Sequence, residues 1–178
     1  MSGFGFNNVA FVGSLAASSG AAGPVVPPSV YARNLIQRPG GSNWSLTQEG
    51  VAATSLLLPD GAIEITPQSQ GGNAYRLRYE YTNTVIANNT NYELWLVAKV
   101  ATGSGTLDIR SEARNEGYHS FTTGLPTVSL TTDYTLQVIP FSTAGLNPAA
   151  GNNMLPTLFL GQSYPQVTTI RDIVLVAV

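Results

Sequence analysis

The feature that most constrains this chain is a succession of short segments in which apolar and polar residues alternate. Turn-forming runs such as "RPGGSN", "LPDG", "QSQGGN" and "TGSG" separate these segments. No segment keeps the 3.6-residue apolar period over the length of a helix. About ten such segments at this spacing predict an all-β fold, a two-sheet antiparallel sandwich or jelly roll. The predicted strands are Val30–Ile36, Asn43–Thr47, Val51–Leu58, Ala62–Thr66, Ala74–Thr82, Tyr92–Thr102, Thr106–Arg114, Tyr134–Phe141, Leu155–Leu160 and Val167–Val178.

The first 29 residues differ from the rest because they contain no charged side chain. A floppy tail is one interpretation. The other is an extended arm that packs on a neighbouring subunit, stiffened by Pro27 and Pro28 where it leaves the body. The large apolar residues favour the arm, and they are Phe4, Phe6, Val9, Phe11, Val12 and Leu15. We therefore predict an arm over residues 1–29 and a jelly-roll domain over residues 30–178. No Lys or Arg precedes the apolar stretch, so we do not expect a secretory signal.

The composition narrows the possible partners. Charged residues make up 10% of the chain, against roughly 25% in ordinary soluble domains. Such a surface is expected where other subunits cover it, or in a secreted β domain rich in Thr, Ser and Asn. A net charge of −2 gives no general attraction to nucleic acid. The chain has no cysteine, and no apolar run approaches the ~20 residues that span a bilayer.

The charged residues are concentrated in the middle strands. Ten of the 18 lie between Arg76 and Glu116, and none lies between Tyr134 and Ile170. Because successive side chains of a strand point to opposite faces, the charged positions share one face if these strands share a sheet. The predicted outward face contains Arg76, Arg78, Glu80, Glu93, Trp95, Lys99, Asp108, Arg110, Glu112 and Arg114.

Three roles remain open for this face. A sugar ring can stack on Trp95 while the charged groups exchange hydrogen bonds with its hydroxyls. Alternatively, the face contacts another subunit. In the third case it is a solvated sheet whose opposite charges pair across strands.

Four stretches, in order, resemble strands of cellulose- and xylan-binding-type carbohydrate-binding modules. The entry strand of these modules resembles "NLIQRPGGSNWSL", and their central strand, turn and next strand are similar to "NTNYELWLVAKVATGSGTLDIR". A later strand and the closing strand resemble "TTDYTLQVIPF" and "TTIRDIVLVAV". The resemblance covers about residues 33–178. It implies a galactose-binding-like β-jelly roll, often with a structural calcium ion, in which one concave sheet can bind a glycan.

The resemblance also implies a candidate metal ligand, and the sequence departs from the family's pattern in two respects. Asp172 matches an acidic position that often supplies a calcium ligand in these modules, with Glu49 and Glu64 as possible further donors. The adjacent acidic partner is missing, since Arg171 and Ile173 flank Asp172. The alternative is a surface Asp paired with Arg171 or Arg33. In addition, glycan-binding modules usually present several aromatic residues on this face, whereas one is counted here.

Catalysis is not expected from these residues. His119 is the single histidine, and no nucleophile-elbow pattern surrounds a serine. The carboxylates Glu80, Glu93, Asp108 and Glu112 alternate with Arg or Lys, which would hold them ionised and unsuited to act as the general acid of a glycosidase. We predict a non-enzymatic protein with no cofactor other than the calcium just considered.

Two functions follow, because a fold does not by itself fix a function. We predict a structural virion protein, a phage capsid decoration or cement, tail or fibre component. It would assemble through its arm with other copies of itself and other virion proteins. The alternative is a glycan-binding module or host-surface adhesin, secreted or at a cell surface, with a cell-surface glycan as its partner. Neither reading involves nucleic acid or insertion into a membrane.

Overall fold

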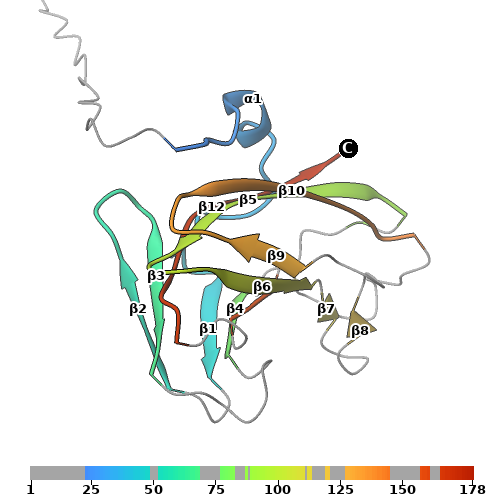
Figure 1. Ribbon diagram of the computed structural model, residues 1–178. Coiled ribbons are helices and arrows are strands. Elements are labelled where there is room, and N and C mark those ends of the chain that lie inside the picture. The colour runs from blue at the N-terminus through green and yellow to red at the C-terminus, as the bar shows by residue number, and fades with distance from the viewer. Residues whose placement is uncertain are drawn as a thin grey trace, which may run out of the picture.

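The computed structural model describes residues 23–48, 52–68, 77–82, 87, 89–110, 112–113, 119–120, 127–144, 157–160 and 165–178. Two antiparallel sheets of five strands each pack face to face (Figure 1). This arrangement confirms the predicted all-β sandwich.

The first sheet, here called the β4 sheet, has the strand order β1-β4-β11-β6-β9. Its strands are β1 (Trp44–Gln48), β4 (Leu77–Tyr81), β11 (Thr157–Phe159), β6 (Gly105–Arg110) and β9 (Thr127–Leu130). The second, the β5 sheet, has the order β10-β5-β12-β3-β2. Its strands are β10 (Thr135–Ser142), β5 (Asn91–Val100), β12 (Thr168–Ala177), β3 (Ile63–Pro67) and β2 (Ala53–Leu57). A small pair joins β7 (Glu112–Ala113) to β8 (His119–Ser120).

The core lies between the two sheets and is built from the apolar positions of each alternating strand. Leu77 and Tyr79 of β4 face Leu94 and Leu96 of β5, and all four side chains are buried. Trp44 stacks on Tyr79 with ring centroids 4.6 Å apart. Each such side chain contributes roughly 1.5–3 kcal/mol when it leaves water, so the inner faces hold the sheets together.

Most predicted strands are present, and the differences have local causes. The predicted strand Val30–Ile36 is wrong, since Pro28–Tyr31 form the short helix α1. Proline suits the first helical position because the N–H group that it lacks would have no hydrogen-bond partner within the helix at that position. The pattern missed β9 and β8, which are four and two residues long. The predicted turn "LPDG" is present between β2 and β3. There Gly61 adopts φ +86°, and Asp60 Oδ1 accepts a hydrogen bond from the Ala62 amide at 3.1 Å.

The described part of the N-terminal arm packs on its own domain. Val26 and Val30 are 3% and 6% exposed and lie against Val97, Val174 and Val176, on the outer side of the β5 sheet. For residues 23–29, the prediction that a neighbouring subunit orders the arm is therefore wrong. Their apolar side chains find a partner in the apolar outer positions of β5 and β12. Residues 1–22 lie outside the described residues, so the prediction for them is not tested.

Candidate functional site

The predicted charged face is divided between the two sheets. Arg78 and Glu80 belong to β4 and Asp108 and Arg110 to β6, all in the β4 sheet. The remaining predicted members on described large strands, Glu93, Trp95 and Lys99, belong to β5 in the other sheet. Because the sheets pack through their inner faces, these two groups occupy opposite outer sides of the sandwich. The prediction of one common face is wrong, since the chain changes sheet between β4 and β5 and again between β5 and β6.

The outer face of the β4 sheet has a buried ion pair on β4, next to the central strand β11. Arg78 and Glu80 are 5% and 0% exposed, and Arg78 Nε lies 4.0 Å from Glu80 Oε2. Thr47 of β1 donates a hydrogen bond to Glu80 Oε1 at 2.7 Å. A charged pair out of water needs such partners to offset its desolvation. The pair and Thr47 therefore form an organised polar unit rather than a solvated surface.

The strand register extends this polar unit into two rows across the sheet. One row aligns Ser45, Glu80, Thr157 and Arg110. The next row aligns Thr47, Arg78, Phe159, Asp108 and Thr127. Acidic and basic positions thus alternate between β4 and β6, with the short strand β11 between them. The register thus places the positions of Arg78, Glu80, Asp108 and Arg110 in two neighbouring rows of the β4 sheet.

Sequence reasoning missed the hydroxyl-bearing and aromatic members of these rows. Thr157 is fully buried, and its hydroxyl has no hydrogen-bond partner among the described residues. Thr47 could have been found, because "WSLTQ" alternates hydroxyls with apolar residues. Thr157 and Phe159 could not, since only the register with β4 and β6 brings β11 between the charged strands.

The outer face of the β5 sheet has a different character. Trp95 donates a hydrogen bond from Nε1 to Glu93 Oε2 at 3.0 Å, and its ring packs against the cluster formed by Val26, Val30 and the β5 and β12 valines. Lys99 Nζ lies 4.7 Å from the centroid of the Tyr134 ring. Trp95 is therefore a partly buried member of an apolar cluster and does not stand among the charges of β4 and β6.

Two predicted members, Arg76 and Arg114, lie outside the described residues, and Glu112 pairs in register with Ser120 in the β7–β8 ribbon. His119 lies in the same ribbon, opposite Ala113. The four candidate carboxylates are thus distributed over β4, β5, β6 and β7 on three different sheets.

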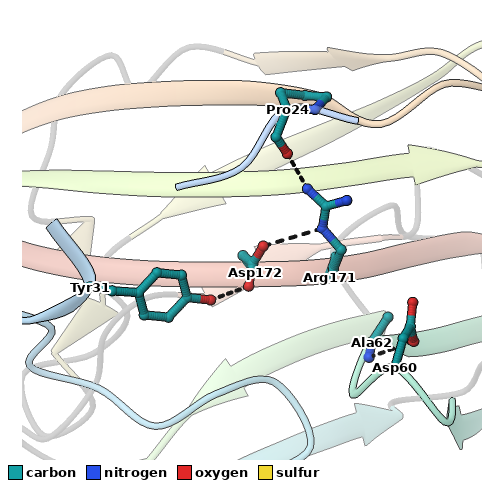
Figure 2. A network of polar contacts seen from close by, with 6 residues as sticks. All are labelled: Pro24, Tyr31, Asp60, Ala62, Arg171 and Asp172. Atoms are coloured by element: carbon teal, nitrogen blue, oxygen red, sulfur yellow. Dashed lines mark hydrogen bonds and ion pairs between the residues drawn. The ribbon is translucent and has the colours of Figure 1, made fainter. Parts of the chain in front are cut away.

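Asp172 takes part in a polar network that fastens the N-terminal segment to β12 (Figure 2). The Tyr31 hydroxyl donates to Asp172 Oδ1, and Arg171 Nε donates to Asp172 Oδ2 at 3.3 Å. Arg171 also donates to the carbonyl of Pro24. Burial, reinforced by the hydrogen bond to the Asp172 carboxylate, raises the pKa of Tyr31 above its usual value.

The described surroundings of Asp172 do not fit the expected calcium ion. Calcium requires six to eight oxygen ligands, whereas both oxygens of Asp172 already accept hydrogen bonds and a guanidinium lies beside them. Within the described ranges, no group of three or more His, Cys, Asp or Glu side chains could hold a metal. Glu64 is on β3, opposite Thr169, and Glu49 lies outside the described residues.

Comparison with known proteins identifies the fold. No protein-family model matches the chain, and no curated protein sequence matches it. Among solved structures, a family 4 carbohydrate-binding module (CBM4) superposes with a TM-score of 0.66 at 13% identity, covering 81% of this chain and 93% of that chain. The second N-terminal cellulose-binding domain of Cellulomonas fimi beta-1,4-glucanase C gives 0.62 at 18% identity, covering 81% and 94%.

The CBM22-1 xylan-binding domain of Paenibacillus barcinonensis Xyn10C gives a TM-score of 0.54 at 11% identity, with 82% and 92% coverage. The chain thus has the β-sandwich fold of carbohydrate-binding modules along nearly the whole length of each. None of the helices in the described part of the chain has the length and apolar character needed to cross a membrane.

Proposed function

We propose that this protein is a carbohydrate-binding domain without catalytic activity and that it binds a glycan on the outer face of the β4 sheet. The observation that carries the proposal is the pair of in-register rows, in which charged and hydroxyl-bearing residues alternate around the Arg78–Glu80 pair.

The chemistry of these rows suits a sugar. Carboxylate oxygens accept hydrogen bonds from sugar hydroxyls, and guanidinium groups donate to them in a fixed planar geometry. Arg78 and Glu80 would form the floor, since both are buried and Thr47 donates a hydrogen bond to Glu80. The β6 positions Asp108 and Arg110 would supply the contacts to ligand, and Phe159 is the aromatic position between the strands.

The structural neighbours support this reading more than a purely architectural one. Two of them are described as cellulose-binding and xylan-binding domains. We therefore take soluble β-linked glucans and xylans as the first probes. A glycan-binding role would place the protein outside a cell or on the surface of a virion.

The test is affinity electrophoresis in gels that contain each polysaccharide, followed by calorimetry with the matching oligosaccharides. Asp108→Asn and Arg110→Gln should each weaken binding by more than about tenfold, because a hydrogen bond to a charged group contributes roughly 1.5–3 kcal/mol. Glu93→Gln, a matched neutralisation on the other sheet, should leave binding unchanged. Retention of full affinity in both β6 variants would refute the proposed site.

A structural virion role, in a capsid decoration, tail or fibre protein, is the second candidate. It is favoured by the low charge content and by apolar side chains on the surface, since Leu56, Leu57 and Val138 are 59%, 59% and 42% exposed. Size-exclusion chromatography with light scattering tests it. Self-assembly supports this role, whereas a monomer at all concentrations with glycan affinity supports the first.

A further inference from the structure

The N-terminal segment enters the described structure at one end of the edge strand β10. A Cβ placed on Gly23 would lie 3.2 Å from Cβ of Tyr134, the residue just before β10. Arg171 donates a hydrogen bond to the carbonyl of Pro24, the residue after Gly23. The guanidinium carbon of Arg171 lies 4.6 Å from the centroid of the Tyr134 ring. The chain before Gly23 therefore starts beside β10.

From this point the segment covers only part of the outer face of the β5 sheet. Val26 and Val30 bury the outer positions of β5 and β12, and α1 lies on this side of the sheet (Figure 1). The outer positions of β10 become more open along the strand: Leu136 packs against the edge of this cluster and is half-buried, Val138 is 42% exposed and Pro140 is exposed. An apolar strip thus continues past the covered part.

The strip ends in a shallow hollow of ≈ 430 Å³ at the far end of β10. Most of the surface that lines the hollow is apolar. The lining residues are Asn91, Tyr92, Glu93, Pro140, Phe141, Ser142 and Val178. Two of the lining residues, Tyr92 and Phe141, stack on each other with ring centroids 5.4 Å apart. The hollow is large enough to receive a big apolar side chain.

The sequence before Gly23 has the matching chemistry and length. Its 22 residues contain no charged side chain and include Phe11, Val12 and Leu15. β10 has eight residues, which corresponds to about 27 Å of extended chain. Leu15 and Phe11 precede Gly23 by eight and twelve residues, so a segment that is not fully extended can place Leu15 over the strip near Val138 and still reach the hollow with Phe11.

We infer that the segment before Gly23 docks on the outer face of its own β5 sheet along β10, and that Leu15, Val12 and Phe11 occupy the strip and the hollow. The tether favours the chain's own segment over that of a second copy, because a short linker gives an effective concentration in the millimolar range. This inference does not depend on glycan binding, which is proposed for the opposite face.

Engineered cysteines test the inference directly, since the natural chain contains none. Val138→Cys is combined in the full chain with Phe11→Cys, Val12→Cys or Leu15→Cys, and disulfide formation under mild oxidation is followed by non-reducing electrophoresis and intact mass. The matched control combines Leu15→Cys with Ser129→Cys, an exposed position on β9 of the opposite sheet.

At least one Val138 pair should close within a single chain about tenfold or more faster than the control, as expected for a docked tether. The product should run as a monomer and be two hydrogens lighter. Disulfide-linked dimers would overturn the inference and assign the strip to the arm of a neighbouring copy. Closure no faster than in the control would show that the segment does not dock there.

Discussion

The outer faces of the two sheets differ although the sequence alternates in the same way in both. On the β4 sheet, the outer positions of the two rows other than Phe159 are charged or hydroxyl-bearing, and Arg78 and Glu80 are buried as a pair. On the β5 sheet, the central outer positions include Val97, Val174 and Val176, and residues 24–31 cover them. The β4 sheet therefore has a polar outer face with a buried ion pair, whereas the central outer positions of the β5 sheet are apolar and pack against the N-terminal segment.

The comparison shows that an outward position in a sandwich is not equivalent to a free surface. Trp95 is outward on β5, yet it packs against the apolar cluster under the N-terminal segment. Glu80 is outward on β4, yet it is fully buried. What each face can do is decided by what covers it, and four substitutions test this distinction.

Removing the carboxylate of the buried pair should have the largest effect. Glu80→Ala leaves the Arg78 guanidinium in a buried position without its acidic neighbour, and breaking such a pair typically costs about 3–5 kcal/mol of unfolding free energy. Urea denaturation followed by tryptophan fluorescence measures it. Glu64→Ala, on the partly exposed outer side of β3, is the control and should change stability little. Equal small losses in both variants would mean that the pair is not buried as described.

Trp95 should behave as a packing residue and not as a sugar platform. Because the ring is only partly buried, Trp95→Ala should lower the free energy of unfolding by about 2–3 kcal/mol, less than a fully buried aromatic. Glycan affinity, measured by calorimetry under conditions where the variant is folded, should be unchanged. A variant of undiminished stability that no longer binds sugar would move the binding site to the β5 sheet.

Adjacent valines in the N-terminal segment provide an internal comparison. Val26 is 3% exposed and Val25 is 64% exposed. Val26→Ala should cost about 1.5 kcal/mol, from roughly 0.8 kcal/mol per buried methylene, whereas Val25→Ala should stay within about 0.5 kcal/mol of wild type. Thermal melts of both variants check this. If the two losses are the same, the segment is not packed on the sheet.

The contact between Tyr31 and Asp172 should make stability depend on alkaline pH. Burial raises the pKa of Tyr31 in the folded state above the unfolded value of 10.0, and burial likewise raises the pKa of Tyr79 to about 12. A raised folded pKa favours the protonated hydroxyl in the native state, so this stability is present below pH 10 and is lost as the pH rises through the folded pKa.

Tyr31→Phe should therefore be slightly less stable at neutral pH and should lose less stability than wild type above pH 10. Urea midpoints measured across the alkaline range give the comparison. Parallel pH curves for the two proteins would show that the Tyr31 hydroxyl is not engaged.

Much of the fold could be predicted from alternation and turns, because these are local properties of the chain. The strands around Leu94 and Val174 and the turn at Gly61 are of this kind. The distribution of strands between sheets could not be predicted, since it depends on pairings such as Thr157 with Glu80, far apart in the sequence. For the same reason the sequence pattern groups Glu93, Trp95 and Lys99 with residues that lie in the other sheet.

The N-terminal segment shows a second limit of prediction from the sequence. Its apolar composition predicts a packing partner, but composition does not specify whether that partner is another subunit or the chain's own sheet. The burial of Val26 and the hydrogen bond from Arg171 to Pro24 settle the matter for residues 23–29.

Mapping backbone amide shifts by NMR during titration with β-linked gluco- or xylo-oligosaccharides would locate the proposed glycan site on the β4 sheet. We expect saturable shifts concentrated on β4, β11 and β6, around Glu80, Thr157 and Asp108, with little change on β5 and β10. Shifts centred instead on Trp95 and Val138, or no saturable shift with any oligosaccharide of these two classes, would contradict the proposal.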